Sequence, residues 1–175
     1  MSTYFLQTER LGFSLWAKAD LHLAKALWGN ADVTRYISAD GKWTEKEVKD
    51  RLLKEIAQYQ NHGVQYCPIF EAKQNVFIGC CGLRPYDLEN GVYEFGCHLV
   101  RSMWGKGYAS EAAMAMIDYA CKDIKANKLF AGHHPQNSAS RKLLERLGFQ
   151  YTHDEYYPPT GLHHPSYELK QPPAQ

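Results

Sequence analysis

The sequence has no apolar stretch close to the roughly 20 residues that a helix needs to cross a lipid bilayer. It also has no run of lysines and arginines, and its formal net charge is only +1. Broad electrostatic binding of nucleic acid is therefore not expected. Residues 1–10 lack the basic start and the long apolar region of a signal peptide. Together these absences predict a cytoplasmic protein with neither a membrane nor a nucleic acid as partner.

The cysteines do not form the pattern of a disulfide framework or of a metal site. There are five of them, an odd number, and none lies in a Cys-x-x-Cys motif. We interpret them as buried free thiols in a reducing compartment. The pairs His133-His134 and His163-His164 lack a further ligand at metal-binding spacing, and adjacent strand residues point to opposite faces. We therefore expect no metal.

The bulk composition is that of one folded domain. The chain has 175 residues, of which 45% are hydrophobic and 22% are charged, which is enough for a substantial core. It contains no internal repeat and no linker. We expect a single domain over residues 1–170 and a flexible tail at residues 171–175.

Hydrophobic periodicity predicts strands and helices mixed along the chain, which is typical of an α+β fold. Strands are expected over residues 10–15, 64–71, 76–83, 92–100, 129–131, 150–156 and 166–170. Helices are expected over residues 21–28, 45–62, 108–123 and 137–147, with a helical turn at 32–37. A capping box at Thr44–Glu47 and a C-cap at Gly148 mark two helix ends. Pro68 cannot donate to a strand ladder, so we expect its strand at an edge or with a local irregularity.

The most informative segment joins the strand at 92–100 to the helix at 108–123. Gly105 and Gly107 open directly into an alanine-rich helix. Glycines at a strand-to-helix junction let backbone amides approach an anion, and the helix dipole favours negative charge there. This segment therefore predicts a phosphate-bearing ligand.

Spacing excludes two kinds of phosphate-binding loop. A P-loop needs a glycine where Val100 stands and a hydroxyl residue where Gly107 stands. A dinucleotide fingerprint needs a third glycine where Ser110 stands. The remaining type is Gln/Arg-x-x-Gly-x-Gly/Ala, and here residues 102–107 have the sequence Ser-Met-Trp-Gly-Lys-Gly. A glycine-rich helix start without a ligand stays open as the alternative.

This loop resembles the one that wraps the pyrophosphate of acetyl-CoA in the GNAT superfamily of N-acetyltransferases, with Ser102 in place of the usual Gln or Arg. Three further stretches resemble the same family: Thr8–Leu11, Tyr93–Gly96, and residues 137–149 with the pattern Asn-x-x-Ser-x-x-Leu-Leu-Glu-x-Leu-Gly-Phe. The order of elements is also similar over nearly the whole chain. The combination resembles the branch that includes the ribosomal-protein N-terminal alanine acetyltransferases and many small-molecule relatives.

The resemblance implies a GNAT-like single domain with a central mixed, mostly antiparallel sheet of six to seven strands and about four helices. Its fourth and fifth strands, here 92–100 and 128–134, would splay apart after a bulge. The pantetheine arm of acetyl-CoA, the acyl-donor co-substrate, would lie in that gap. The residues implied to contact acetyl-CoA are Leu99, Val100, Arg101, Trp104, Gly105, Lys106, Gly107, Tyr108, Ala109, Asn137 and Ser140. For three of them another role is open: Lys106 facing solvent, Trp104 packing the loop, and Asn137 capping its helix.

Acetyl transfer to an amine requires a base, because an ammonium group has no lone pair. Glu94 is our first candidate, and a surface carboxylate is the alternative. His98 shares the face of Glu94 and is a second candidate, although a packed strand histidine is as plausible. By resemblance, the Leu99 amide would stabilise the thioester oxygen and Ser140 would donate to the departing sulfur. Ser140 is otherwise a helix serine that bonds to its own backbone.

The acceptor would enter between the early helices and the last hairpin. Aromatic and acidic residues in these regions suit an amine such as a peptide N-terminus, a polyamine or an aminoglycoside; they are Tyr36, Trp43, Tyr156, Tyr157, His163, Asp40, Asp154 and Glu155. We thus predict a monomeric or homodimeric N-acetyltransferase that moves an acetyl group from acetyl-CoA directly to a primary amine in a ternary complex. A non-catalytic acyl-CoA-binding or sensor module is the alternative.

Overall fold

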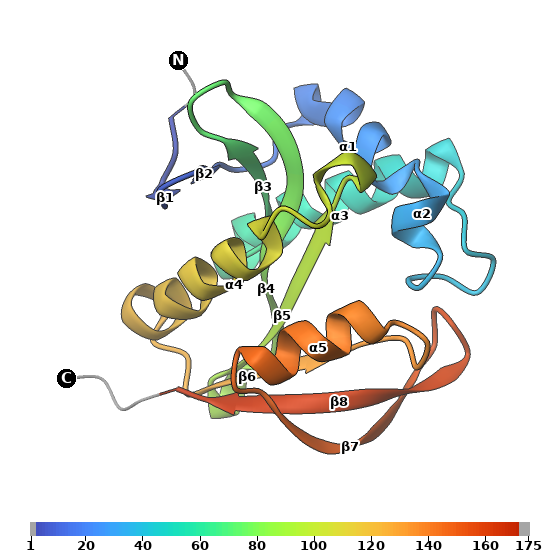
Figure 1. The fold of residues 1–175 in the computed structure, drawn as a ribbon, viewed down its shortest axis with the longest axis vertical. Helices are drawn as coiled ribbons and strands as arrows, with labels where there is room; N and C mark the ends of the chain where they lie inside the picture. The colour runs from blue at the N-terminus through green and yellow to red at the C-terminus, as the bar shows by residue number, and fades with distance from the viewer. Residues whose placement is uncertain (1–2, 172–175) are drawn as a thin grey trace.

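One mixed sheet organises the chain in the computed structural model, which describes residues 3–171 (Figure 1). Eight strands pair in the order β1-β2-β3-β4-β5-β6-β8-β7, and β5–β6 is the parallel pair. The strands are β1 Leu6–Gln7, β2 Leu11–Phe13, β3 Tyr66–Glu71, β4 Val76–Asp87, β5 Val92–Leu99, β6 Lys128–Gly132, β7 Gln150–Tyr157 and β8 Leu162–Lys170. The predicted mixed, mostly antiparallel sheet is confirmed, with more strands than expected.

Five α-helices accompany the sheet in the described residues: α1 Leu21–Trp28, α2 Ala31–Thr34, α3 Glu45–His62, α4 Tyr108–Tyr119 and α5 Ser138–Arg146. Short 3₁₀ turns lie at Lys18–Asp20, Leu88–Asn90 and Arg101–Met103, and a π turn at Ala120–Ile124 extends α4. The predicted capping box is present, because the Thr44 and Glu47 side chains each accept from the other residue's backbone amide.

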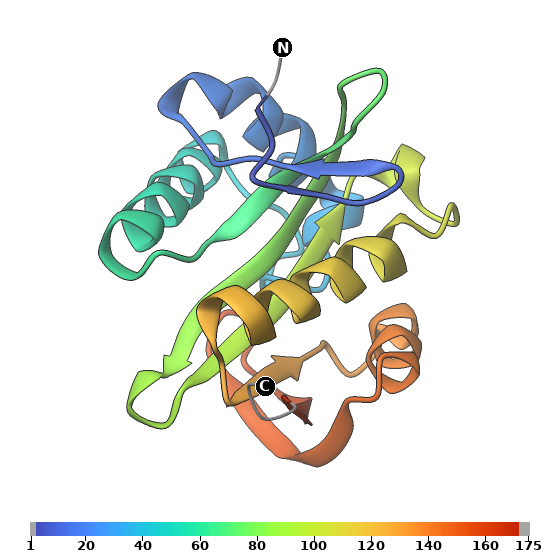
Figure 2. The same ribbon diagram turned by 90° about the vertical axis from the view of Figure 1, so that its left-hand side faces the viewer.

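The helices cover the two faces of the sheet in separate layers. Helices α1 and α3 pack with Tyr66 and Cys80 on one face, and α4 packs on the other, as Figure 2 shows. Alternation along β5 divides its side chains between these layers. Phe95, Cys97 and Leu99 join the α4 side. Glu94 and His98 consequently lie on the α1–α3 side.

Strands β5 and β6 part after a short parallel seam. Their paired residues run from Val92↔Lys128 to Glu94↔Phe130. Beyond this point β5 stays paired with β4 as far as Leu99, while β6 follows β8, so a gap opens between them (Figures 1 and 2). The predicted splay is present. The expected bulge is not on either parting strand, because the register shift of the β4–β5 ladder lies on β4, between Pro85 and Asp87.

Several boundaries differ from the prediction for physical reasons. Strand β1 has only two residues and exists through its pairing with β2, so it gives no local signal. The helical turn expected at 32–37 is α2, which Asn30 caps by accepting from the Asp32 amide. Strand β4 extends to Asp87 because it follows β5. Next to Pro68, the β3–β4 register shifts between Ile69 and Phe70, which confirms the expected irregularity.

Other predictions concern the cysteines and the chain end. The five cysteines are not joined in disulfides; Cys67, Cys80 and Cys81 are buried, whereas the other two are half-buried. At the end of β8, the Gln171 amide donates to the Asn127 carbonyl over 3.1 Å. Residues 172–175 of the expected tail lie outside the described residues. Within residues 3–171, no helix combines the length and the apolar character needed to cross a membrane.

Candidate active site

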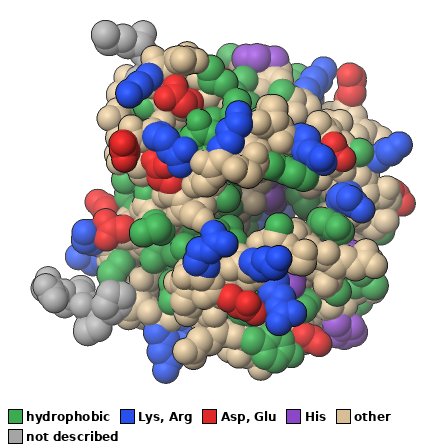
Figure 3. Space-filling model, viewed as in Figure 1, with side chains coloured by type: hydrophobic (Ala, Val, Ile, Leu, Met, Phe, Trp, Pro, Cys, Tyr) green, Lys and Arg blue, Asp and Glu red, His purple; other side chains and the backbone are tan. Residues whose placement is uncertain are grey.

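The gap between β5 and β6 opens into a cleft of about 660 Å³. In Figure 3 this hollow separates the upper half of the molecule from the half that carries α5. One end of the cleft is lined by the loop that leads into α4 and by α5. The other end is lined by residues of α3, β4, β7 and β8. We call these the loop end and the hairpin end.

The glycine loop has a backbone that only glycine adopts easily. Gly105 and Gly107 have φ angles of 74° and 79°, in the left-handed region. Gly107 is the N-cap residue of α4 and has no side chain to occupy the first amides of the helix. The amides at the start of α4 therefore stay free for an anion. This is the geometry that the sequence predicts for a phosphate cradle.

The segment before β2 fixes this loop in place. The Arg10 guanidinium donates from Nη1 to the Lys106 carbonyl at 2.9 Å, and its Nε lies 2.6 Å from Oε2 of Glu111. Thr8 also donates to the Glu111 carboxylate. Burial opposes ionisation of Glu111, but the hydrogen bonds from Thr8 and Arg10 outweigh it and lower the pKa of this carboxyl. The Thr8–Leu11 motif thus anchors the start of α4.

Most of the predicted cofactor residues line the cleft: Leu99, Trp104, Gly105, Gly107, Tyr108, Ala109, Asn137 and Ser140. Val100, Arg101 and Lys106 are not among its lining residues in the described chain. The Val100 amide donates to the Ile78 carbonyl at 3.0 Å, and its side chain packs in the α1–α3 core. Arg101 pairs with Asp32 at 3.7 Å. Lys106 is exposed, in accord with the solvent-facing alternative.

The Leu99 amide points into the gap. Successive residues of an antiparallel strand direct their backbone groups alternately to opposite sides. Because Val100 bonds toward β4, Leu99 directs its amide away from β4. Its carbonyl, on the same side, accepts from Trp104 Nε1 at 2.9 Å, so Trp104 packs the loop against the strand. The Leu99 amide is therefore placed to donate to a group in the cleft, and its catalytic role stays a prediction.

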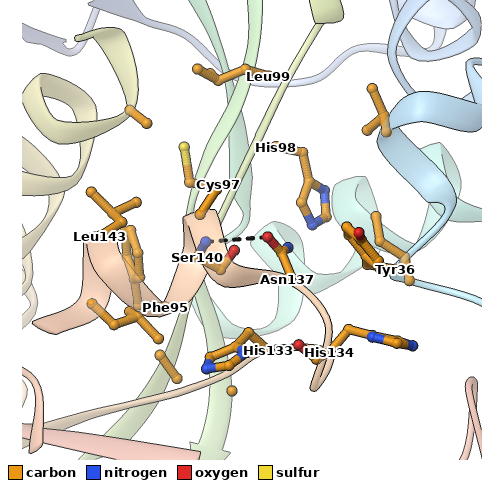
Figure 4. Close-up of a pocket in the computed structure, with 18 of the residues that line it drawn as sticks. Tyr36, Phe95, Cys97, His98, Leu99, His133, His134, Asn137, Ser140 and Leu143 are labelled. Atoms are coloured by element: carbon orange, nitrogen blue, oxygen red, sulfur yellow. Dashed lines mark hydrogen bonds between the residues drawn. The ribbon is translucent and has the colours of Figure 1, made fainter. Parts of the chain in front are cut away.

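Asn137 and Ser140 come from the start of α5. The Ser140 amide donates to Oδ1 of Asn137 at 3.2 Å, which confirms the capping alternative for Asn137 (Figure 4). This bond commits the amide oxygen, so the side-chain NH₂ of Asn137 remains to donate to a ligand. Ser140 also lines the cleft.

Glu94 lies at the hairpin end beside two arginines. Burial raises the pKa of Glu94 above its ordinary value, while the charges of Arg84 and Arg51 act in the opposite direction. The carboxylate lines the cleft and is therefore reachable by a ligand. Glu94 is half-buried, so the geometry favours the functional interpretation over an ordinary surface carboxylate.

His98 is held as a neutral ring. The indole Nε1 of Trp28 donates to its Nδ1 at 3.2 Å, and the Tyr66 ring lies edge-on at 5.9 Å. Burial lowers the pKa of His98 to about 3. With Nδ1 occupied as an acceptor, the ring proton lies on Nε2. His98 consequently has no basic nitrogen to offer at neutral pH.

Sequence reasoning missed the ionic cluster that surrounds Glu94. Glu55 has no exposed side-chain area and accepts from Arg51 Nε at 2.8 Å. Arg84 Nη2 lies 4.0 Å from the same oxygen, and the second oxygen of Glu55 accepts from the Tyr66 amide at 2.8 Å. The signal was present, because Glu55 stands among the apolar positions of the predicted helix at 45–62.

Only part of the predicted acceptor region faces the cleft. Tyr36, Glu155 and Tyr157 line it, whereas the other five predicted residues do not appear among its lining residues in the described chain. Trp43 packs against Trp28, and Tyr156 stacks with His163 on the hairpin. Strand alternation explains why residues 155 and 157 face inward together. The missed histidines His133, His134 and His164 line the cleft as well.

A backbone contact near the hairpin end joins two distant loops, and the described residues include no metal-binding group. The Ala39 amide donates to the Pro159 carbonyl at 2.7 Å and joins the loop after α2 to the β7–β8 turn. Over residues 3–171, no three His, Cys, Asp or Glu side chains gather as a candidate metal site. The expectation that no metal is used stays a prediction.

Comparisons with known proteins place this geometry in a family. A model of the acetyltransferase (GNAT) domain matches residues 10–150. The uncharacterized N-acetyltransferase p20 from Bacillus licheniformis is 32% identical over 147 residues, which cover 83% of this chain and 82% of the relative.

Two solved structures have similar folds. Ribosomal-protein-S5-alanine acetyltransferase from Vibrio fischeri superposes with a TM-score of 0.76 at 19% identity, covering 97% of each chain. Spermidine N-acetyltransferase from Vibrio cholerae, in complex with CoA and spermine, superposes with a TM-score of 0.77 at 18% identity, covering 94% of this chain and 97% of the other. The predicted family is thereby confirmed, and the structural neighbours include a member of the predicted branch. This chain belongs to the GNAT family and is an acetyltransferase.

Proposed function

We propose that this acetyltransferase takes its acetyl group from acetyl-CoA and transfers it directly to a primary amine within a ternary complex. One observation carries the proposal: a single cleft joins a glycine-rich helix start at one end to the half-buried carboxylate of Glu94 at the other. The structural neighbours support the donor and the acceptor class, since one was solved with CoA and spermine and is a spermidine acetyltransferase.

The loop end fits the donor. Uncapped amides at the start of α4 suit the pyrophosphate, since both the dipole and the free donors favour an anion. The NH₂ group of Asn137 and the Leu99 carbonyl, which keeps a second lone pair beside its bond from Trp104, suit the amide groups of the pantetheine arm. Acetyl-CoA supplies an acyl thioester that is already activated, so the protein needs no covalent nucleophile.

At the hairpin end, Glu94 accepts the proton that the incoming ammonium group must lose. Its raised pKa, caused by burial, makes it a better proton acceptor than an ordinary surface carboxylate. His98 is not the base in this scheme, because its pKa is about 3 and Trp28 occupies its Nδ1.

Two further groups act on the reacting thioester. The amide of Leu99 donates to the carbonyl oxygen as negative charge develops on it, a role that fits a rigid backbone donor. The hydroxyl of Ser140 donates to the sulfur as the bond between carbon and sulfur breaks. The neutral amine that Glu94 has produced forms the new bond to the carbonyl carbon, and the second proton that its nitrogen then loses ends on the sulfur of CoA by way of Ser140.

The test combines binding with turnover. Calorimetric titration with acetyl-CoA should give saturable binding, and a panel of amines and peptides should release free CoA that a thiol reagent detects. A reaction without acceptor corrects for the five cysteines of the chain itself. Absence of acetyl-CoA binding would overturn the proposal. Binding without CoA release on any acceptor would support the acyl-CoA-binding module instead.

We also propose that the enzyme works in the cytoplasm as a monomer or homodimer. Cysteines that are not joined in disulfides suit a reducing compartment. Size-exclusion chromatography with light scattering measures the assembly state, and a trimer or larger assembly would contradict the proposal.

A further inference from the structure

We infer that the amine acceptor carries a carboxylate, which Arg51 and Arg84 bind at the hairpin end of the cleft. The inference rests on the proposed function, since it names the acceptor class for the same site. It narrows a choice among peptides, polyamines and aminoglycosides that the sequence leaves open.

The first observation is that the arginines in this cluster outnumber the carboxylate that pairs with them. Arg51 and Arg84 approach the same carboxylate oxygen of Glu55, at 2.8 and 4.0 Å. The other oxygen of Glu55 is occupied by the Tyr66 amide. Apart from Glu94, the proposed base, a single carboxylate therefore serves two guanidinium groups. The excess of positive charge also affects Lys54. Burial is the main cause that lowers the pKa of Lys54, and the charges of Arg84 and Arg51 lower it further.

The second observation is that both arginines hold unused donors. Nη2 of Arg51 and Nε of Arg84 are buried without a hydrogen-bond partner among the described residues. The Arg51 side chain is only 10% exposed, and both arginines line the cleft. A buried donor without a partner is costly, and a guanidinium group matches a carboxylate in shape and charge. These two nitrogens are themselves closed off from the cleft, so an anion there contacts the parts of Arg51 and Arg84 that line it and offsets their positive charge.

The third observation is that the arginines are held rigidly. The Arg51 guanidinium lies 4.9 Å from the Trp28 ring centroid and 5.3 Å from that of Tyr66. Arg84 lies 4.8 Å from the same Tyr66 ring. The two groups are therefore positioned before any ligand arrives, which lowers the entropic cost of binding.

Charge balance during the reaction favours the same acceptor. With Glu94 ionised, the two arginines face two carboxylates, those of Glu55 and Glu94. Once Glu94 has taken the proton of the amine, the cluster holds one uncompensated positive charge. A carboxylate on the acceptor restores the balance, whereas a polyamine adds further positive charge near both arginines. The other acids in the lining are already engaged, Glu155 by Tyr86 at 2.6 Å and Asp32 by Arg101 at 3.7 Å.

The test compares acceptors that differ in one group. Straight-chain aminocarboxylates from 3-aminopropanoate to 6-aminohexanoate and free α-amino acids are assayed beside their carboxamides, with spermidine and a short neutral peptide as further arms. We expect the best acid to exceed its amide in kcat/KM by roughly ten- to hundredfold, the value of a charge-assisted hydrogen bond. Arg84→Gln should reduce this ratio to less than about threefold, mainly by raising KM for the acid. Arg141→Gln, on the exposed face of α5, should keep the ratio.

The outcomes separate this inference from the proposed function. If the amides, spermidine or the peptide are turned over as well as the acids or better, the inference of a carboxylate on the acceptor is wrong, while the proposed acetyl transfer stands. Tight acetyl-CoA binding with no turnover of any acid overturns the inference as well. Loss of acetyl-CoA binding overturns both proposals. Acetyl-CoA affinity measured for Arg84→Gln shows that this variant is folded, so an unchanged acid-to-amide ratio in a folded variant also contradicts the inference.

Discussion

Trp28 donates its indole proton to Nδ1 of His98 across 3.2 Å, and this bond fixes a histidine of the active-site strand in one neutral tautomer. Both residues lie on the α1–α3 side of the sheet, where Cys80 Sγ also approaches the same nitrogen at 3.8 Å. A side chain that the sequence offers as a second base is therefore a structural acceptor. Its Nε2–H is its remaining donor.

The first prediction concerns the charge of His98. We expect its ring to stay neutral between pH 5 and 9, because burial lowers its pKa to about 3. Long-range ¹H–¹⁵N correlation spectra should show a protonated Nε2 and an unprotonated Nδ1 throughout this range. A His98 signal that titrates with a midpoint between pH 6 and 7 would contradict the assignment and restore His98 as a base.

The second prediction concerns Glu94. Replacement of Glu94 by Gln should reduce kcat at neutral pH by roughly 10²–10⁴-fold, the usual contribution of a general base. The acidic limb of the pH profile of the wild-type rate should lie above the ordinary range of a glutamate, because burial raises the Glu94 pKa. Activity should fall as the pH drops through that pKa, and the variant should lose this limb.

The control for this experiment is Glu155→Gln. Glu155 lines the same cleft, but Tyr86 and His153 engage its carboxylate. The Glu155→Gln variant should keep the acidic limb of the wild-type pH profile. Identical pH profiles for wild type and Glu94→Gln would remove Glu94 as the base.

The third prediction tests the loop with a matched pair of glycines. Gly105 and Gly161 have φ angles of 74° and 72°, and a Cβ at either position would meet no atom within 4 Å. Gly105→Glu should weaken acetyl-CoA binding at least tenfold, because it brings a negative charge to the proposed pyrophosphate site. Gly161→Glu carries the same backbone strain and charge at the β7–β8 turn and should leave the affinity unchanged. Equal affinities in a calorimetric titration would exclude this loop.

The fourth prediction concerns the stability of the ionic cluster. Glu55→Gln should lower the free energy of unfolding by about 3–5 kcal/mol, since removing one partner of a buried pair leaves the other charge uncompensated. Urea denaturation at pH 7 measures the difference. Glu45→Gln on the same helix is the control, because Glu45 is 87% exposed and should be nearly neutral. A loss below about 1 kcal/mol for Glu55→Gln would show that the cluster is more hydrated than its burial indicates.

The fifth prediction concerns Glu111 and acid. Its pKa in the folded protein is depressed, so its ionised form stabilises the fold above the unfolded pKa near 4.3, and this contribution disappears as pH falls through the folded pKa. Glu111→Gln should therefore cost about 1–3 kcal/mol at pH 7 and progressively less below pH 4. Urea unfolding of both proteins across this range measures the difference in their free energies of unfolding. If this difference grows as the pH falls, the pKa of Glu111 is raised in the folded protein and the prediction is wrong.

The sequence correctly predicted those elements whose ends are set by residues nearby in the chain. The ends of α3 follow from Thr44, Glu47 and Gly63, all within a few residues of the helix they bound. Strand β1 and the extension of β4 were not predictable in this way, because pairing with distant strands creates them. The position of the bulge on β4 likewise depends on the register between two strands.

The site was predicted where residues share one strand or one loop. Glu94, Leu99 and the two loop glycines follow from alternation and from the strand-to-helix junction. Val100 was assigned to the cofactor because nothing in the sequence shows that its amide bonds to Ile78. The cluster of Arg51, Glu55 and Arg84 joins a helix to a strand some 30 residues away, and a single sequence gives no measure of such a contact.

The parallel seam between β5 and β6 has a mechanical consequence. Only three residue pairs join the two strands at the base of the cleft, so beyond Glu94 and Phe130 no strand pairing holds β5 to β6. A donor molecule that lies between the two strands adds contacts to both of them there. Its binding adds about 2.7 kcal/mol of stability at a hundredfold excess over Kd, so the melting temperature rises with donor concentration.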